Sequence, residues 1–290
     1  MKNKWSKEKK RVTLKVIKTY KPKSKALEKY VELFYEFTSD KPCDISYIAF
    51  PHVNTAISFF KGVDIHRDNY RVNIVSSAKS RTKCNIEILG KYTQPVFVHY
   101  KGKCEEFAIV FKPLGINHFF RDDLIEIAPE YSQALNNESW VKFSPVLFNE
   151  KTITGRIEMM EMFLLENLRE IKEVSFYNAL KYLEDFDANY SIDKIAELCG
   201  FNLKTFQRNF KKQLTCSPLE YKRIVRFRHS VNNWLISKEL KTLTNVSYES
   251  NYYDQSYFIR EYKKLTHLNP KQFFNSIIAL DERNIVWKIR

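Results

Sequence analysis

The chain of 290 residues contains only 6 glycines, which limits the chemistry that it can support. A phosphate-binding loop and the turn that exposes a catalytic serine both need glycine where the backbone turns sharply or approaches a ligand. The sequence holds neither a glycine-rich phosphate loop nor a Gly-x-Ser-x-Gly turn. We therefore expect no catalytic residues of these kinds and no cofactor.

Metal-binding patterns are also missing. A metal site needs converging ligands, yet the histidines stand singly and the cysteines have no Cys-x-x-Cys spacing. The residues concerned are His52, His66, His99, His118, Cys43, Cys84, Cys104, Cys199 and Cys216. We expect no metal, and reduced thiols typical of an intracellular protein. Redox sensing by one of the cysteines is the alternative interpretation.

Long apolar runs are absent as well. No segment approaches the roughly 18 apolar residues of a membrane span. The lysine-rich N-terminus is not followed by the hydrophobic stretch of a signal peptide. We expect a cytoplasmic protein with no membrane contact. A hydrophobic content of 44% in 290 residues is enough for the cores of two domains.

The positive charge is unevenly distributed. Residues 1–30 carry 12 Lys and Arg against 2 acids, and residues 200–290 carry 17 against 7, so each segment has a net charge of +10. The segment between them, residues 31–199, has a net charge of −6 because the whole chain carries +14. A polyanionic partner such as double-stranded DNA would therefore meet the C-terminal part or the basic tail of residues 1–18.

An internal repeat lies within the basic C-terminal part. Residues 202–221 and 254–273 align at an offset of 52 positions. Phe206 aligns with Phe258, and Arg208 with Arg260. In each copy, apolar residues recur at helical spacing on one face and polar, cationic residues occupy another. A short amphipathic stretch precedes each copy, so the pattern predicts two helix-turn-helix units, with Asn202 and Asp254 as N-caps. A helical bundle with a solvated cationic face is the alternative.

The C-terminal hundred residues resemble the DNA-binding domain of the AraC family of bacterial transcription regulators. The matching segments are Ser191–Phe201, Phe206–Lys212, Ser217–Tyr221, Asp254–Lys264 and Asn269–Phe273. The resemblance implies an all-α domain over residues 172–290, with recognition helices at 203–213 and 255–265 joined by a long helix, Pro218–Ile236. Thr215, Asn251 and His267 replace glycines that are usual in the family, so we expect the helices before Thr215 and His267 to end differently.

The exposed faces of these helices supply the candidate DNA contacts. Arg is suited to guanine and Gln to adenine, whereas Lys pairs with phosphate without specifying sequence. The base-reading candidates are Lys204, Gln207, Arg208, Gln255, Ser256, Ile259 and Arg260. The phosphate candidates are Lys211, Lys212, Lys263 and Lys264.

The N-terminal half has a β-rich pattern. Six short runs separated by turn residues predict an antiparallel, barrel-like sheet within a domain of residues 19–155. The runs are Ile45–Phe50, Thr55–Phe60, Tyr70–Ser76, Lys83–Leu89, Val96–Tyr100 and Glu106–Phe111. Aromatics here either line an apolar pocket or fill the core, namely Phe59, Phe60, Tyr70, Phe97 and Phe107. The fold class expected for the whole chain is α+β.

This half is similar to the cupin-like sensor domains that precede some AraC-type modules. The resemblance is carried by Phe50–Asn54, Gly90–Pro95 and Phe107–Gly115, and it implies sensing of a small-molecule effector or dimerisation. Residues 156–171 form a candidate linker or dimer helix, with packing inside one domain as the alternative. RNA polymerase and a second protomer are further candidate partners. The alternative function is a cupin-like small-molecule-binding protein or enzyme with an accessory DNA-binding module.

Overall fold

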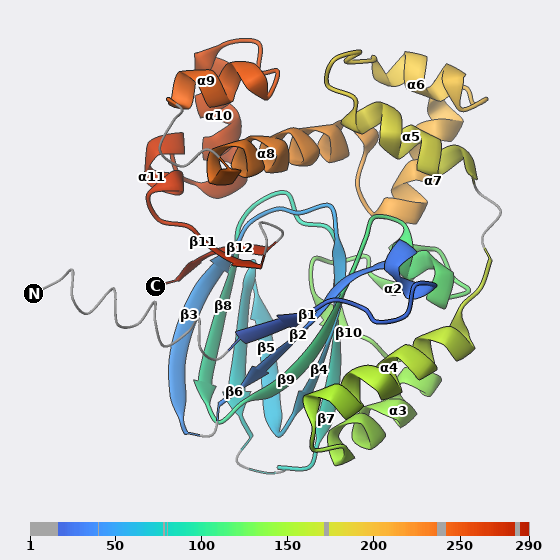
Figure 1. Cartoon of the computed structure of the whole chain (residues 1–290), viewed down its shortest axis with the longest axis vertical. Coiled ribbons are helices and arrows are strands. Elements are labelled where there is room, and N and C mark those ends of the chain that lie inside the picture. The colour runs from blue at the N-terminus through green and yellow to red at the C-terminus, as the bar shows by residue number, and fades with distance from the viewer. Residues whose placement is uncertain are drawn as a thin grey trace, which may run out of the picture.

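The computed structural model describes residues 17–39, 41–77, 79, 81–170, 174–236, 242–281 and 285–289. Two β-sheets form the lower part of the molecule, and a layer of helices lies across one end of them (Figure 1). This is the α+β arrangement of an N-terminal β-rich domain followed by a helical domain that the sequence predicts. Of the basic tail of residues 1–18, residues 1–16 lie outside the described part of the chain.

The first sheet is antiparallel, and all of its strands come from residues 17–134. Its strand order is β1(Ile17–Tyr20), β2(Val31–Thr38), β9(Glu105–Phe111), β4(Thr55–Lys61), β7(Cys84–Leu89) and β10(Gln133–Ala134). Strand β2 is buried on both faces: Phe34 packs toward the helices α3(Glu138–Asn149) and α4(Ile153–Asn167), and Leu33 and Phe37 pack between the sheets. Apolar and polar residues alternate along β2 except at Phe34, which stands between Glu32 and Glu36 on the otherwise polar face.

The second sheet faces the first. Its strand order is β11(Ile278–Asp281), β12(Ile285–Ile289), β3(Cys43–Ala49), β8(Val96–Gly102), β6(Arg71–Ser76) and β5(Val63–Asp68). The β6–β8 pair is parallel, so the expectation of a purely antiparallel arrangement is wrong at this point. The strands form two separate sheets and do not close into one barrel, because no ladder joins an edge of one sheet to the other among the described residues.

Helices cover the outer face of the first sheet. They are the 3₁₀ turns η1(Leu27–Lys29) and η2(Gly115–Phe119) and the helices α2(Leu124–Ile127), α3(Glu138–Asn149) and α4(Ile153–Asn167). Helix α4 corresponds to the candidate dimer helix. Its side chains Ile157, Met160 and Leu164 are 0–3% exposed in the core that the sheet forms with α3. For these side chains packing inside one domain is therefore the observed arrangement; Ile171 lies outside the described residues.

The upper layer contains seven helices in the described residues. They are α5(Val174–Glu184), α6(Ile192–Leu198), α7(Leu203–Leu214), α8(Pro218–Ile236), α9(Leu243–Glu249), α10(Gln255–Thr266) and α11(Pro270–Phe274). Figure 1 shows α8 as a long horizontal helix with α5, α6 and α7 at one end and α9, α10 and α11 at the other. This agrees with the two predicted units and the predicted linker Pro218–Ile236.

The chain then returns to the sensor domain, which the sequence did not lead us to expect. Strand β12 pairs with both β11 and β3, with Trp287 opposite Ala49 and Ile289 opposite Tyr47. The second sheet is therefore built from residues on both sides of the helical layer. Because a strand's partner can be hundreds of residues away, its pairing is not visible in a local window of sequence.

Candidate nucleic-acid interface

Both recognition helices begin at the predicted caps. The Asn202 side chain accepts a hydrogen bond from the backbone N–H of Thr205 at 2.9 Å, and the Asp254 side chain accepts one from Tyr257 at 2.6 Å. Each cap satisfies one of the free N–H groups at the start of a helix, which is typically worth about 1 kcal/mol. The two units are thus alike in local structure as well as in sequence.

Both helices also end in the same way. Thr215 has φ 56° and His267 has φ 58°, and the N–H of each donates to the carbonyl four residues earlier, at Lys211 and Lys263. The expectation that these ends close differently because glycine is missing is wrong. Both residues adopt the left-handed conformation, which costs a non-glycine residue roughly 1–2 kcal/mol.

Apolar side chains anchor each recognition helix on one side. Phe206, Phe210 and Leu214 of α7 are fully buried against Phe176, Leu180 and Leu183 of α5, as the sequence predicts. Phe258, Tyr262 and Leu265 of α10 are buried against α8 and α11. The opposite faces are open. Exposed positions there are Lys204, Gln207, Arg208, Lys211, Lys212, Gln255, Ser256, Arg260, Lys263 and Lys264, and Ile259 is half-buried.

Helix α8 holds the second unit in place through polar contacts. The Ser230 hydroxyl and the Tyr262 hydroxyl lie 2.7 Å apart in the buried interface between α8 and α10. Arg223 on α8 lies 3.8 Å from the carboxylate of Glu261. Lys222, the residue before Arg223, contacts the first unit instead: its Nζ donates to the carbonyl of Tyr190 at 2.6 Å. Because both units contact the same helix, their separation is set by α8.

The first recognition helix is attached to the sensor domain near its C-terminal end. Lys212 Nζ lies 3.2 Å from a carboxylate oxygen of Asp123, just before α2. Gln213 donates to Asp123 at 2.7 Å and accepts from Asn117 Nδ2 at 2.6 Å. Figure 1 shows the end of α7 beside α2. One candidate phosphate contact, Lys212, is therefore held by a sensor carboxylate in this structure.

A second attachment joins α8 to the sensor sheet. Arg228 Nε donates to the carbonyl of Pro51 at 2.7 Å, and Nη2 donates to that of Phe50 at 2.8 Å. Its Nη1 is buried and has no hydrogen-bond partner among the described residues. Burial lowers the pKa of Arg228 to about 10. The Phe50 ring also packs edge-on against Phe273, with centroids 4.8 Å apart.

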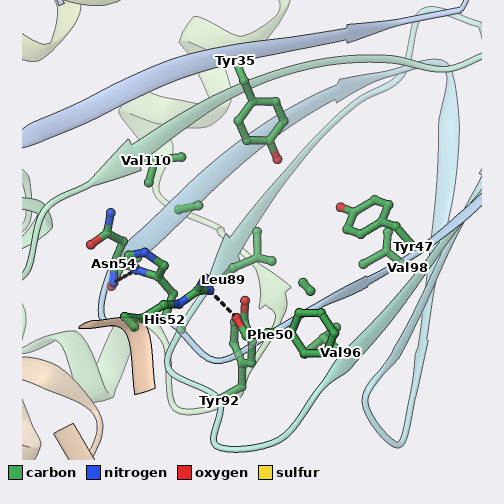
Figure 2. Close-up of a pocket in the computed structure, with 15 residues that line it drawn as sticks. Tyr35, Tyr47, Phe50, His52, Asn54, Leu89, Tyr92, Val96, Val98 and Val110 are labelled. Atoms are coloured by element: carbon green, nitrogen blue, oxygen red, sulfur yellow. Dashed lines mark hydrogen bonds between the residues drawn. The ribbon is translucent and has the colours of Figure 1, made fainter. Parts of the chain in front are cut away.

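Arg228 borders a cavity of about 100 Å³ between the two sheets and α8. Its lining is mainly apolar, and Tyr35 and Tyr47 project from opposite sheets toward the interior (Figure 2). The other lining residues are Ala49, Phe50, His52, Asn54, Thr55, Ala56, Leu89, Gly90, Tyr92, Val96, Val98 and Val110. None of the five aromatics proposed from the sequence is among them; Phe59, Phe60 and Phe107 lie in the core.

Sequence reasoning missed both attachments. A signal for Arg228 was present, because Ile224, Phe227 and Val231 occupy one face of α8 and Arg228 interrupts this apolar stripe. Asp123 carries no comparable signal, since its partner lies on another domain. Within the described residues, no cluster of three or more His, Cys, Asp or Glu is arranged to hold a metal, and no helix is long and apolar enough to cross a membrane.

Family comparisons bear on both halves of the chain. Residues 195–276 match the model of a family described as a helix-turn-helix domain, and residues 18–132 match that of a domain of unknown function (DUF6597). No curated protein matches the sequence. The helix-turn-helix match covers both recognition helices and the helix that joins them.

Solved structures of ToxT from Vibrio cholerae are similar in outline. One, at 1.65 Å resolution, has 11% identity and a TM-score of 0.47 over 90% of this chain and 98% of that chain. Another, of ToxT bound to an unsaturated fatty acid, has 12% identity and a TM-score of 0.42 over 82% of this chain and 96% of that chain. At these values neither structure assigns a function to this chain.

The family match and the paired helices define a DNA-binding transcription regulator. Residues 195–276 form a helix-turn-helix domain of the AraC type, which confirms the resemblance noted from the sequence. The partner of this domain is DNA.

Proposed function

We propose that this protein regulates transcription by reading two successive major-groove segments with α7 and α10. The observation that supports this most directly is the matched pair of capped helices, each with one buried and one exposed cationic face, at either end of α8. Successive major-groove segments on one face of DNA are about 34 Å apart. A pair of helices fixed to one rigid helix suits such a spacing.

Within each helix the exposed residues divide by chemistry. Arg208 and Arg260 are the proposed guanine contacts, because a guanidinium can donate two parallel hydrogen bonds to guanine O6 and N7. Gln207 is suited to adenine, and the half-buried Ile259 to a thymine methyl group. Lys204, Gln255 and Ser256 complete the proposed base-reading set. Lys211, Lys212, Lys263 and Lys264 are the proposed phosphate contacts.

The experiment is selection of bound sites from a random duplex pool with the full chain, followed by spacer insertion. We use the full chain because β12 of the C-terminal hairpin pairs with a sensor strand. Two conserved half-motifs should emerge, and adding half a helical turn between them should abolish binding. Selection of a single half-motif, or binding that tolerates the insertion, would leave only one unit as a specific reader.

We further propose that the cavity beside Arg228 binds a small effector with an apolar body and one anionic group. A buried cation without a charged partner is unfavourable, and an anion would supply the missing acceptor for Nη1. An apolar cavity of about 150 Å³ binds benzene, so the cavity of about 100 Å³ suits a molecule of similar or smaller size. The proposal assigns binding to the sensor domain and no catalysis.

Isobutyrate, which has as many heavy atoms as benzene, is the probe for this effector site, with isobutyramide as the neutral control of the same shape. Isobutyrate should raise the melting temperature, because a ligand at about 100 times its Kd stabilises the fold by about 2.7 kcal/mol. Isobutyramide should not. Arg228→Lys should weaken the isobutyrate effect, whereas Arg223→Lys, on the same helix but outside the cavity, should retain it. Equal shifts of the melting temperature with both compounds would show that the anionic group is not needed for binding.

Two further contacts remain predictions: association with a second protomer and binding to RNA polymerase. The core side chains of α4 pack inside their own domain, so a dimer would have to use another surface or the exposed side of this helix, where Met162 is 62% exposed. Sedimentation of the full chain with and without operator DNA tests self-association, and co-purification with the polymerase tests the other contact.

A further inference from the structure

Two cysteines of the sensor domain meet at one carbonyl group. Cys43 is the first residue of β3 and lies opposite Gly102 on β8, and Cys104 follows in the turn between β8 and β9. The Cys43 thiol donates to the Gly102 carbonyl oxygen at 3.2 Å, and the Cys104 thiol lies 3.9 Å from the same oxygen. The two side chains are close enough that each is the main cause of the shift in the other's pKa. Residues 61 positions apart in sequence thus form a dithiol pair.

The two thiols are chemically different. The hydrogen bond from Cys104 lowers the pKa of Cys43 well below that of an ordinary thiol, and a hydrogen bond from Ser39 acts in the same direction. The same pairing, with burial, raises the pKa of Cys104. Cys43 is half-buried and Cys104 is 3% exposed. The more accessible thiol is therefore the better nucleophile, and the buried one is the proton donor beside it.

The pair lies beside a hollow that is open to solvent. Cys104 lines this hollow of about 490 Å³, to which Lys61, Arg81, Lys103 and Glu105 also contribute. Three cations and one carboxylate give the lining a net positive charge. Ser39 and Pro42, the near neighbours of Cys43, line the same hollow. Small oxidants can therefore approach the pair from solvent.

We propose that Cys43 and Cys104 form an intramolecular disulfide when the protein meets a hydroperoxide. The Cys43 thiolate attacks the terminal peroxide oxygen, the O–O bond breaks, and the leaving alkoxide or hydroxide takes up a proton. The resulting sulfenic acid is attacked by the Cys104 sulfur, which loses its proton as water leaves. Two thiols lose two electrons and two protons, and the peroxide is reduced to water and an alcohol, or to two molecules of water from hydrogen peroxide.

The disulfide would join the start of β3 to the β8–β9 turn. The next residues along the chain make structural contacts: Glu105 pairs with Arg156 of α4 at 2.6 Å, and the buried Glu106 accepts hydrogen bonds from Tyr35 and Tyr100. The bond would thus constrain a turn that connects both sheets. Since a cross-link restricts the unfolded chain, the oxidised protein should melt at a higher temperature than the reduced one.

The test treats the reduced full chain with a small excess of hydrogen peroxide, alkylates it with N-ethylmaleimide after denaturation and measures the intact mass. The chain has 5 cysteines, so two fewer adducts, three in place of five, are expected. Digestion should recover one linked peptide pair containing Cys43 and Cys104, and dithiothreitol should restore all five adducts.

Variants identify the residues responsible. Cys43→Ser and Cys104→Ser should each abolish the linked peptide, and Cys104→Ser should leave a sulfenic acid on Cys43 that dimedone traps. Cys84→Ser is the matched control: Cys84 is also half-buried and at the start of a strand, but burial raises the pKa of its thiol. This variant should be oxidised like the wild type. Five remaining adducts, a disulfide between other cysteines, a covalent dimer, or sulfinic acid at Cys43 without a cross-link would each overturn the proposal.

Discussion

Arg228 Nη2 donates a 2.8 Å hydrogen bond to the carbonyl oxygen of Phe50, although 178 residues separate the two in sequence. Through this bond the helix that joins the two helix-turn-helix units is attached to the end of strand β3, at the edge of the cavity between the sheets. The acceptors of the guanidinium are neutral carbonyl groups. Because no carboxylate pairs with it in the described part of the chain, its charge can be compensated by an anionic ligand.

Arg208→Ala should reduce the affinity for the selected operator by about 1–3 kcal/mol and relax the preference at one base position, because the bidentate contact to guanine is lost. Lys211→Ala is the comparison, since it lies one turn along the same exposed face. It should weaken all duplexes alike and reduce the salt slope by about one. Titration of cognate and scrambled duplexes at several salt concentrations measures both. Equal loss on the two duplexes for Arg208→Ala would contradict base reading.

Asp123→Asn should strengthen DNA binding, because it releases Lys212 from the ion pair at 3.2 Å and leaves the lysine free for a phosphate. The pair is partly exposed and worth at most about 1 kcal/mol, so a gain of a few fold is expected. The gain should shrink as salt rises. Glu138→Gln is the control, as it breaks an exposed pair with Lys142 on helix α3 of the sensor domain. An unchanged affinity for Asp123→Asn would show that Lys212 reaches DNA while paired, or does not reach it at all.

His267→Gly should stabilise the protein by up to about 1 kcal/mol, because glycine adopts the left-handed conformation without the steric cost. Thr215→Gly should gain less. Thr215 has the same conformation, but its hydroxyl accepts a hydrogen bond from the backbone N–H of Lys91 in the sensor domain at 3.4 Å. Losing that bond offsets the relief by about 1 kcal/mol. Urea unfolding measures the stability of both variants. Equal gains in the free energy of unfolding would mean that the hydrogen bond with Lys91 does not contribute to stability.

The stability of the wild type relative to Lys91→Met should rise with pH above about 8. Burial lowers the pKa of Lys91 to about 8, from 10.5, and its ammonium bonds to Val53 and Thr55 and to no carboxylate among the described residues. Between these two values the unfolded chain binds more protons than the folded one, so the free energy of unfolding increases with pH. Over the whole interval the difference is about 3 kcal/mol, and below pH 8 it should be constant. Unfolding curves of both proteins at pH 7, 8, 9 and 10 test this; parallel pH profiles would contradict a buried, charged Lys91.

The helical layer was predictable because its signals are local. Caps at Asn202 and Asp254, the apolar stripe through Phe206 and Phe210, and Pro218 at the start of α8 all lie within one or two turns of the structure that they determine. The left-handed ends at Thr215 and His267 were misjudged because residue preference was weighed without the surrounding contacts. A preference of roughly 1–2 kcal/mol is outweighed when the rest of a helix is well packed.

The sensor domain was predictable only in part. Six strands with clear boundaries were identified, whereas the doubly buried β2, the edge strand β5 and the C-terminal pair were not. The cavity depends on residues from both sheets and on Arg228 of a distant helix, so no sequence window contains it. The dithiol of Cys43 and Cys104 has the same origin: the residues meet only because β3 and β8 pair.

The C-terminal hairpin has a consequence for how the protein is made. Strand β3 leaves the ribosome early, but its neighbour β12 is synthesised only after the whole helical layer. During translation one edge of β3 is therefore open, and an open edge strand can pair with strands of other chains. A nascent chain stalled before residue 285 would expose this edge, and release of the last strand would cover it. Aggregation of this protein should thus increase when translation through the helical layer is slowed.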